Sequence, residues 1–272
     1  DLPIPTREGY RFNGWYYDSK LKNEVTGDVK VNISVVTLYA GWTAVEVPSM
    51  LNGDDHFAYV QGYKDGNVRP YGLISRAETT TIFFRLLKDS VRDGNLLTSN
   101  TYTDVTGDYW ANTAISTMTG LGIVQGRSAD TFDPNAPITR AQFAAICARF
   151  DTGKTYGSQS FSDIQGHWAQ AYIERAAELG WIKGFEDGTF RPDTYITRAQ
   201  AMTMINRVLN RTPDDEDDLL DNMNVWPDCT PNDWFYLAVQ EATNSHDFKY
   251  QGGEVWTKLT KAANALNKND RF

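Results

Sequence analysis

The sequence predicts a mainly α-helical protein built from three related units, and three observations support this prediction. A segment that starts with glycine and ends in Ser/Thr-Arg-Ala-Glu/Gln occurs three times without gaps, beginning at Gly62, Gly126 and Gly184. In every copy the arginine lies 14 residues after the glycine. An apolar stretch of helical character follows each copy, as expected for a repeat architecture.

A second element, which contains a tryptophan, precedes two of these copies. It begins at Asp104 and at Asp163, and in both cases the tryptophan lies 16 residues before the next repeat glycine. A third version begins at Asp228, near the far end of the chain. The apolar residues have the spacing of one face of an amphipathic helix, as in the series Ala169, Tyr172, Ile173, Ala176 and Ala177.

The first and last copies are complementary halves. The first lacks the tryptophan element, and the last lacks the glycine segment. A repeat unit cannot bury its apolar face alone, so we expect the two ends to meet, with residues 226–246 completing the unit that begins at His56. The alternative is that the C-terminal half is a diverged copy that packs as an ordinary end cap.

The composition excludes several classes of protein. Apolar residues make up 41% and charged residues 22% of the 272 residues, which is typical of a globular chain. No apolar run approaches the roughly 18 residues of a membrane-spanning helix, so we expect no membrane insertion. The net charge of −9 argues against a nucleic-acid partner, although a local basic pocket could still bind an anion.

Cysteine and histidine usage predicts no metal site and no cofactor. The two cysteines, Cys147 and Cys229, cannot form a disulfide framework or a four-ligand zinc site. The histidines, His56, His167 and His246, are scattered without metal-ligand spacing. We expect Cys147 to be buried and inert on the apolar side of its helix, and Cys229 to react more readily in a loop.

Residues 161–200 resemble the S-layer homology (SLH) domain. They carry that family's F-x-D…H-W, G-x-x-D-G-x-F-x-P and I-T-R-A-E/Q elements as FSDIQGHW, GFEDGTFRP and ITRAQ. The resemblance covers about residues 52–250 in three copies. It implies a pseudo-threefold, all-helical spindle with a short central bundle and three helix-loop-helix prongs, in which the N- and C-terminal halves close the third unit.

The same resemblance implies a function. SLH triplets anchor secreted Gram-positive surface proteins non-covalently to the peptidoglycan-linked secondary cell-wall polysaccharide, often through its pyruvylated N-acetylmannosamine. We therefore expect an extracellular protein of the cell wall or S-layer, with this polysaccharide as its partner. The rival interpretation is a structural module that assembles an S-layer through contacts with other S-layer subunits, without direct glycan recognition.

The first 44 residues resemble a second family, the Listeria–Bacteroides repeat, which is a small extracellular β-grasp-like module. The segments that carry this resemblance are PTREGYRFNGWYYD from Pro5 and TLYAGWT from Thr37. That family usually opens with a strand that ends near an Asn-Gly-Gly turn, which is absent here. A β module without its first strand leaves an exposed edge, so we expect this piece to be partial.

These resemblances divide the chain into seven expected segments. They are a β-rich module at 1–44, a linker at 45–51, the back half of repeat 1 at 52–98, repeat 2 at 99–153, repeat 3 at 154–212, an acidic connection at 213–225, and a C-terminal half repeat with its tail at 226–272.

Each Ser/Thr-Arg-Ala-Glu/Gln motif is a capping box, which places its arginine at the first helical position. A cation there opposes the helix dipole, at a cost of about 0.3–1 kcal/mol. A docked carboxylate, such as that of a pyruvyl ketal, would turn this electrostatic cost into a stabilisation. It would accept hydrogen bonds from free backbone N–H groups and from the guanidinium together. We expect this role for Arg76, Arg140 and Arg198. The alternative is that these arginines hold the repeats together by pairing with nearby acids, for example Asp104, Asp163 or Asp228.

Other recurring residues complete the predicted glycan-binding set. The repeat glycines, Gly62, Gly126 and Gly184, supply a turn that no side chain could occupy, and the resemblance adds that they lie beside the sugar. A tryptophan at a helix start packs a core more often than it stacks on a sugar, and both interpretations stay open for Trp110, Trp168 and Trp234.

The three predicted sites differ in charge. One position carries Lys64, Arg127 or Glu186, so the third site should be weaker for an anion. The second copy has Asp133 where the others have Arg69 and Arg191, a departure that makes its pocket less favourable. We therefore expect the first site to contribute most.

Catalysis and calcium binding have weaker support. Carboxylates are plentiful, but no pair of them stands in a distinct catalytic module, so we expect no enzyme. The acidic run at 214–218 lacks the D-x-D-x-D-G spacing of a calcium loop and is typical of a solvated connection.

Overall fold

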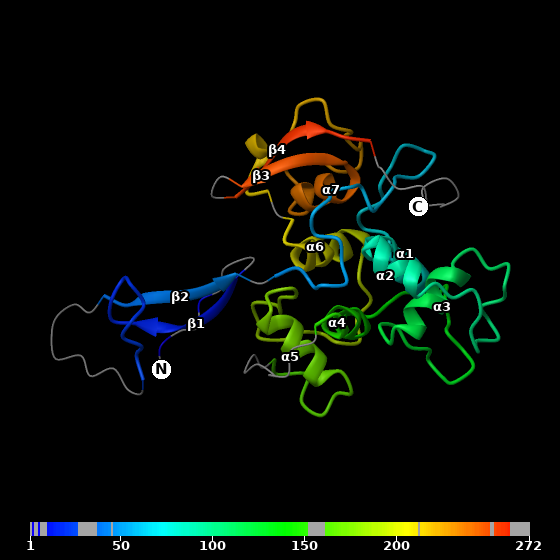
Figure 1. The fold of residues 1–272 in the computed structure, drawn as a ribbon, viewed down its shortest axis with the longest axis horizontal. Coiled ribbons are helices and arrows are strands. Elements are labelled where there is room, and N and C mark those ends of the chain that lie inside the picture. The colour runs from blue at the N-terminus through cyan, green and yellow to red at the C-terminus, as the bar shows by residue number, and fades with distance from the viewer. Residues whose placement is uncertain are drawn as a thin grey trace.

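The computed structural model describes residues 2, 5, 10–26, 37–44, 46–151, 161–211, 213–250 and 253–261, and it confirms a mainly helical protein (Figure 1). The helices are α1 (Arg76–Leu86), α2 (Asp89–Gly94), α3 (Asn112–Gly120), α4 (Arg140–Arg149), α5 (Gln170–Glu178), α6 (Arg198–Leu209), the 3-10 helix η1 (Glu216–Asp218) and α7 (Tyr236–Thr243). Two antiparallel hairpins complete it, β1 (Tyr10–Tyr16) with β2 (Tyr39–Ala44), and β3 (His246–Tyr250) with β4 (Glu254–Leu259).

Three hydrogen bonds form a closed ring at the centre of the helical body. The amide of Ile138 donates to the carbonyl of Ile74 (3.0 Å), that of Ile196 to Ile138 (3.1 Å), and that of Ile74 to Ile196 (3.4 Å). All three side chains are buried. Because each isoleucine lies two residues before a repeat arginine, the ring arranges α1, α4 and α6 around one centre (Figure 1).

The three central helices begin with the predicted capping boxes. The side chains of Ser75, Thr139 and Thr197 accept from the third helical amide, and Glu78, Gln142 and Gln200 reach back to the cap amide. The first two helical amides donate to the turn of another unit. In α1, the amides of Arg76 and Ala77 donate to the carbonyls of Ala136 and Pro134, both at 2.9 Å. The equivalent bonds run from α4 to Thr194 and Pro192, and from α6 to Gly72 and Pro70.

Each central helix packs against one outer helix. These pairs are α1 with α3, α4 with α5, and α6 with α7. The outer helix always comes from the tryptophan element that follows the central helix in the chain. Helix α7 therefore takes the place beside α6 that α3 takes beside α1.

The segments near the two ends of the chain are hydrogen-bonded together. The amides of Tyr59 and Val60 donate to the carbonyl of Ala242 in α7, at 3.1 and 3.0 Å, and the amide of His246 donates to the carbonyl of His56 at 2.9 Å. Residues 226–246 thus lie against residues 56–62, which is the contact expected from the two complementary halves.

The hairpin β3–β4 was not foreseen, so the expectation of an all-helical body is wrong in this part. Phe248 and Tyr250 pair with Trp256 and Glu254 across the hairpin. Its alternating aromatic and polar residues favour a strand, and Gly253 precedes the second strand. The hairpin packs beside α7 and carries His246 into the interior.

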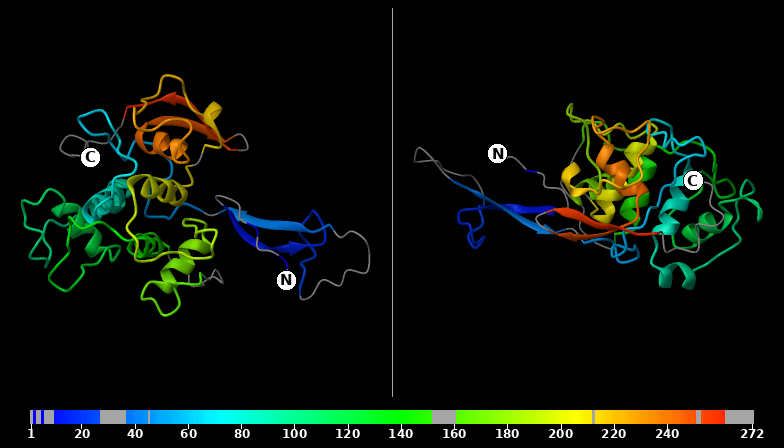
Figure 2. Two further views of the ribbon diagram at one scale, coloured as in Figure 1. Left: turned by 180° about the vertical axis from the view of Figure 1, so that it is seen from behind. Right: turned by 90° about the horizontal axis from the view of Figure 1, so that it is seen from above.

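The N-terminal hairpin stands apart from the helical body (Figures 1 and 2). Phe12 packs edge-on against Trp15 and Trp42, with ring centroids 5.5 and 5.6 Å apart. The end of the expected linker is not a free connection, because Leu51 is buried and pairs with Leu87 just after α1.

Ending the chain at Arg211 should lower the melting temperature by more than about 10 °C, because α6 would lose its partner helix and several fully buried side chains. Among those lost are Phe235, Val239 and Ala242. Removal of residues 1–45 is the control and should leave the helical transition unchanged. Thermal melting followed by circular dichroism makes the comparison. Equal melting of the chain that ends at Arg211 and the full chain would contradict the contact between the two ends.

Candidate functional site

The three repeat arginines lie at the seams between units. Nε of Arg76 donates to the carbonyl of Phe132 (2.9 Å), and its Nη2 donates to that of Gln125 (2.8 Å). The equivalent bonds are Arg140 to Phe190 (2.8 Å) and Lys183 (3.0 Å), and Arg198 to Val68 (3.0 Å). All three arginines are buried. Each guanidinium therefore tethers its helix to a loop of another unit.

Free amides at the helix N-termini, which the carboxylate hypothesis requires, are not present. The first two amides of α1, α4 and α6 donate to carbonyls of another unit, and the third donates to the capping hydroxyl. The expectation that a ligand would collect these amides is wrong, because protein backbone already occupies that place.

The arginines do hold the repeats together, as the alternative expects, but they do so through backbone carbonyls rather than through Asp104, Asp163 or Asp228. Arg198 also lies 3.6 Å from a different acid, Glu78. Each of the three aspartate carboxylates accepts two successive backbone amides from the turn of its own unit. The bonds are Asp104 to Phe132 and Asp133 (2.9 and 2.7 Å), Asp163 to Phe190 and Arg191 (2.8 and 2.7 Å), and Asp228 to Val68 and Arg69 (3.0 and 2.7 Å). These aspartates hold the turn in place.

The second amide in each turn belongs to a left-handed residue. Arg69, Asp133 and Arg191 have φ of 53°, 60° and 58°. Aspartate tolerates this conformation better than most side chains do. Asp133 is thus compatible with the turn.

The repeat glycines are required for close packing rather than for an unusual backbone angle. Gly62, Gly126 and Gly184 are not among the described glycines with positive φ. A Cβ at these positions would collide with the rings of Trp226, Tyr102 and Phe161 respectively. The expected turn that excludes a side chain is present. Its physical cause is an aromatic ring two residues before the aspartate that begins each tryptophan element, together with turn carbonyls at Gly126 and Gly184.

The tryptophans are surface residues. Trp110, Trp168 and Trp234 are 40%, 58% and 65% exposed, so core packing is the wrong interpretation. Each lies two residues before its helix starts. Each ring also packs against the aromatic residue next to it in the chain, so one part of the ring is held by the protein and another part faces solvent.

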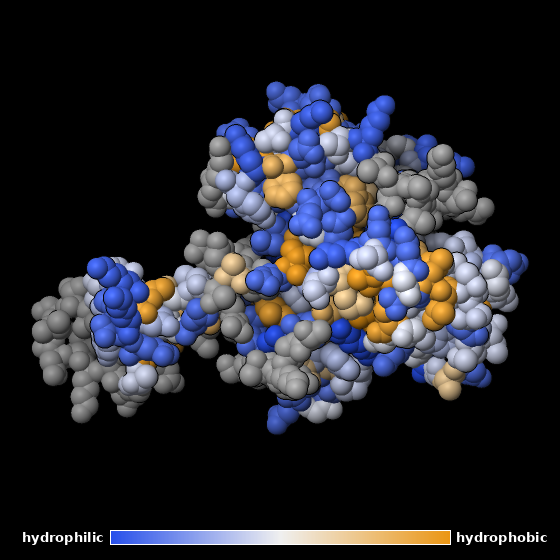
Figure 3. Space-filling view, in the orientation of Figure 1, coloured by the Kyte–Doolittle hydropathy of each residue, from blue (hydrophilic) through white to orange (hydrophobic). Residues whose placement is uncertain are grey.

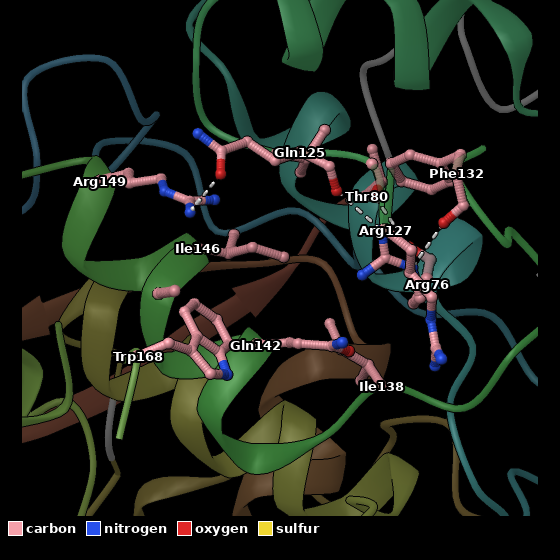
Figure 4. A pocket seen from close by; sticks show the side chains of 13 residues that line it. Arg76, Thr80, Gln125, Arg127, Phe132, Ile138, Gln142, Ile146, Arg149 and Trp168 are labelled. Atoms are coloured by element: carbon pink, nitrogen blue, oxygen red, sulfur yellow. Dashed lines mark hydrogen bonds between the residues drawn. The ribbon is translucent and has the colours of Figure 1, made fainter. Parts of the chain in front are cut away.

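Arg76, Gly126, Arg127 and Trp168 line one groove of about 380 Å³ (Figure 4). Helix α4 forms one side of it with Gln142, Ile146 and Arg149. Trp168 and Arg149 lie at one end, and Arg76 and Arg127 lie at the other (Figure 4). The groove therefore joins cationic groups to one aromatic face.

The groove is positively charged. Burial, followed by repulsion from Arg127, lowers the pKa of Arg76 to about 10, so its guanidinium stays charged at neutral pH. Arg127 contacts Asp133 at 3.0 Å, where both side chains are largely exposed. Arg149 donates to the Ile123 carbonyl and the Gln125 side chain, both at 3.1 Å. An anion in this groove would therefore meet several guanidinium groups.

The predicted residues meet across copies rather than within them. Arg76 meets the loop of Gly126 and Arg127, not Lys64 of its own copy, and Trp168 comes from a third copy. Arg140 bonds to Lys183, the residue before Gly184, and Arg198 lies 5.0 Å from the ring of Tyr63, beside Gly62. The grouping of each arginine with the loop of its own copy is wrong, because each helix N-terminus inserts into another unit.

Sequence reasoning also missed a cluster of titratable residues. His56 and His246 are not scattered, since their ring nitrogens Nδ1 and Nε2 lie 3.2 Å apart. Glu241 and Glu254 lie beside them, and all four side chains are buried. The expected contact between the two ends of the chain was the signal that could have found this cluster.

Both cysteines are free and buried. Burial raises the pKa of the Cys147 thiol, as expected of an inert residue. Burial, together with Asp233 and Asp228, raises the pKa of Cys229 to about 12. Cys229 lies in a loop, as expected, but the loop is packed and the side chain is only 3% exposed, so we now expect little reactivity from either thiol.

Comparison with known families gives two matches. The model of the S-layer homology domain matches residues 101–144 and 160–202, and the model of the Listeria-Bacteroides repeat domain matches residues 1–41.

Relatives match the repeats over longer stretches. Cell surface glycoprotein 1 of Acetivibrio thermocellus is 35% identical over 219 residues, which cover 76% of this chain and 9% of the relative. The Cellulosome-anchoring protein of the same organism is 34% identical over 210 residues, 75% of this chain and 46% of the relative. The Surface-layer 125 kDa protein of Lysinibacillus sphaericus is 33% identical over 159 residues, 55% of this chain and 13% of the relative.

This chain spans less than half the length of these relatives. Other matching relatives are named as enzymes, an amylopullulanase and an exoglucanase. None of the helices in the described part of the chain is long and apolar enough to cross a bilayer.

Replacing Asp163 by Asn should lower the free energy of unfolding by about 1.5–3 kcal/mol, because an amide cannot accept both turn N–H groups. Asp193→Asn is the control, since the side chain of Asp193 is 82% exposed. Denaturant titration of both variants gives the comparison. Equal stability of the two variants would show that the aspartate does not hold the turn.

Neither thiol should react with Ellman's reagent in the native protein. At pH 8 a thiol with a pKa near 12 is deprotonated in only about one molecule in 10,000, and burial limits access further. Both should react after denaturation. Fast labelling of Cys229 in native buffer would contradict its packed position.

Proposed function

The chain contains S-layer homology domains and an N-terminal Listeria–Bacteroides repeat, and on this premise we propose that its groove at Arg76 binds an acidic sugar of the secondary cell-wall polysaccharide. SLH-mediated anchoring of a surface protein to the cell wall is the function of this region, which acts at the cell surface. The proposed ligand is a carboxylate-bearing sugar such as pyruvylated N-acetylmannosamine.

The observation that carries this proposal is the meeting of Arg76, Arg127, Arg149 and Trp168 in one groove. Guanidinium groups bind carboxylates through paired N–H donors, and an aromatic face suits the apolar C–H surface of a sugar ring. The whole chain carries a net charge of −9, so this local concentration of positive charge runs against the average.

Arg76 has both a structural and a binding role in this proposal. Its Nε and Nη2 are taken by the carbonyls of Phe132 and Gln125, and within the described residues no acceptor bonds its Nη1. The side chain lines the groove, so this remaining nitrogen is the group that would meet a carboxylate. The two backbone bonds fix the guanidinium before the ligand arrives, which lowers the entropy cost of binding.

By analogy, the same arrangement should recur at the other two seams of the ring. The second groove would combine Arg140, the loop at Gly184 and Trp234. The third would combine Arg198, the loop at Gly62 and Trp110. Arg198 lies 3.6 Å from Glu78, an acid that would compete with an anionic ligand. Asp133 competes in the same way for Arg127, but the groove at Arg76 also contains Arg149, so we expect it to bind an anion most strongly of the three.

The region is non-catalytic in this proposal, and the alternative is lattice assembly through protein contacts. Apolar residues gather on one face over α1, α2 and α3 (Figure 3), and Leu96 and Leu97 after α2 are 50% and 44% exposed. Such a surface could pack against another S-layer subunit. Binding to purified cell walls that is lost when the polysaccharide is removed would favour the glycan over this alternative.

A titration with two short sugars tests the ligand directly. Pyruvylated N-acetylmannosaminide should bind, while its non-pyruvylated parent should bind at least about tenfold more weakly, because it lacks the carboxylate. Isothermal titration calorimetry with a monovalent sugar avoids avidity along the polymer. Equal affinity for the two sugars would contradict the anionic ligand.

Replacing Arg127 by Ala should weaken binding of the pyruvylated sugar by about ten- to a hundredfold, because a charge-assisted contact is lost. Arg127 is preferred to Arg76 for this test, since its side chain is 44% exposed and its removal leaves no buried carbonyl unpaired. Arg127→Lys should restore part of the affinity, because lysine keeps the charge but loses the fork. Lys249→Ala, an exposed residue of β3, is the control for net charge. Unchanged affinity of the Arg127→Ala protein would exclude this groove.

A further inference from the structure

Four buried side chains converge where the two ends of the chain meet. His56 lies before α1, Glu241 belongs to α7, and His246 and Glu254 lie on β3 and β4. None of the four is more than 4% exposed. One nitrogen or oxygen from each lies within 4.8 Å of the others. The cluster lies apart from the groove at Arg76 and shares no residue with it.

The distances within the cluster fit four ligands around one ion. The contacts of His56 Nδ1 are 2.8 Å to Glu254 Oε1, 3.2 Å to His246 Nε2 and 3.4 Å to Glu241 Oε1. His246 Nε2 lies 3.2 Å from Glu254 Oε1 and 3.3 Å from Glu241 Oε2. A tetrahedral Zn²⁺ with bonds of about 2.0–2.2 Å sets its ligand atoms roughly 3.3–3.6 Å apart. Small movements of these side chains would therefore make room for the ion.

Neighbouring groups orient these side chains in the manner of an outer coordination shell. His246 Nδ1 donates to the carbonyl of Asn244 (3.0 Å), which leaves Nε2 facing the cluster. Trp256 Nε1 donates to Glu241 Oε2 (3.0 Å). The ring of His246 stacks on Trp256, and that of His56 stacks on Phe248, with centroids 3.9 and 3.7 Å apart. Both imidazoles are thus held in fixed orientations.

One carboxylate oxygen of the cluster lacks a hydrogen bond. Within the part of the chain that the structure describes, the buried Glu241 Oε1 makes no hydrogen bond, although His56 Nδ1 lies 3.4 Å away. Arg211, fully buried nearby, donates through Nη2 to the carbonyls of Asn52 (3.0 Å) and Asp55 (2.6 Å), and its Nε has no partner among the described residues. A buried carboxylate oxygen without a donor is costly, and a cation between the two glutamates and the two imidazoles would remove that cost.

We propose that His56, Glu241, His246 and Glu254 bind one divalent transition-metal ion of the Zn²⁺ type, which joins the N-terminal and C-terminal parts of the helical body. Two nitrogen and two oxygen ligands suit Zn²⁺, whereas Ca²⁺ takes six to eight oxygens at longer distances. Four protein ligands fill a tetrahedral shell, so this is a structural site rather than a catalytic one.

A route for the ion leads to the cluster from the surface. A groove of about 420 Å³ is lined by His56 and His246, and its other lining residues include four aspartates: Asp54, Asp55, Asp89 and Asp247. Such a surface attracts divalent cations. The metal would link residues almost 200 positions apart in the chain, because His56 and Glu254 are separated by 198 residues.

Zn²⁺ titration of the full chain, after treatment with a chelator and dialysis, tests the proposal. We expect one tightly bound Zn²⁺ per chain and a melting temperature that rises with free Zn²⁺, since the ion binds only the folded state. Co²⁺ should give the intense visible absorption of a tetrahedral site. Absence of stoichiometric Zn²⁺ binding, or the weak spectrum of octahedral Co²⁺, would overturn the proposal.

Two variants locate the site. Glu241→Gln should weaken Zn²⁺ binding by more than about 100-fold. Loss of a metal ligand costs more affinity than the 10- to 100-fold that is typical for loss of an outer-shell hydrogen-bond partner. Trp256→Phe keeps an aromatic ring beside His246 but removes the hydrogen bond to Glu241. It should weaken Zn²⁺ binding by about 10- to 100-fold without unfolding the chain. His167→Gln changes the third histidine, which lies outside the cluster and contacts Asp193, and should leave the Zn²⁺ affinity unchanged. Full affinity in both the Glu241→Gln and Trp256→Phe proteins would overturn the assignment.

Discussion

A closed ring of three backbone hydrogen bonds, from Ile74 to Ile196 to Ile138 and back to Ile74, is the constraint on which the rest of the structure depends. A cyclic arrangement of this kind requires all three units to be present and in register. It brings each helix N-terminus against the turn of another unit, whose carbonyls accept the first two helical amides. The helix dipole is thus satisfied by protein backbone at α1, α4 and α6 alike.

This constraint explains why an arginine stands at the first position of each central helix. Its charge opposes the helix dipole, but the guanidinium points across the seam to the carbonyls of another unit, and Phe132 and Phe190 also place their rings 4.5 Å from Arg76 and Arg140. The primary role of the arginine is therefore to hold two units together. Arg76 also lines the groove because the glycine loop of the second copy and the tryptophan of the third copy meet at the same seam.

The groove and the histidine cluster both depend on how distant segments meet. Arg76, Gly126 and Trp168 come from three successive copies, so no single repeat contains a complete groove. His56 and His246 come from opposite ends of the repeat region. Closing the ring thus forms the groove proposed to bind the polysaccharide. It also brings together the groups proposed to hold a metal, at the seam between the first and last copies. These two copies are the farthest apart along the chain. Bringing them together therefore costs more conformational entropy than forming either of the other two seams.

The sequence by itself determined the repeat, the three central helices with their capping boxes, the burial of Cys147 and the meeting of the two ends. These features follow from local spacing and from the need of half a unit for its other half. Only the tertiary structure decided that Asp104, Asp163 and Asp228 hold turns, that the tryptophans are exposed, that each arginine serves another copy and that His56 meets His246. Spacing along one chain records which residues recur, but hydrogen-bond partners across a seam depend on how the units insert into one another, and that is a property of the assembled ring.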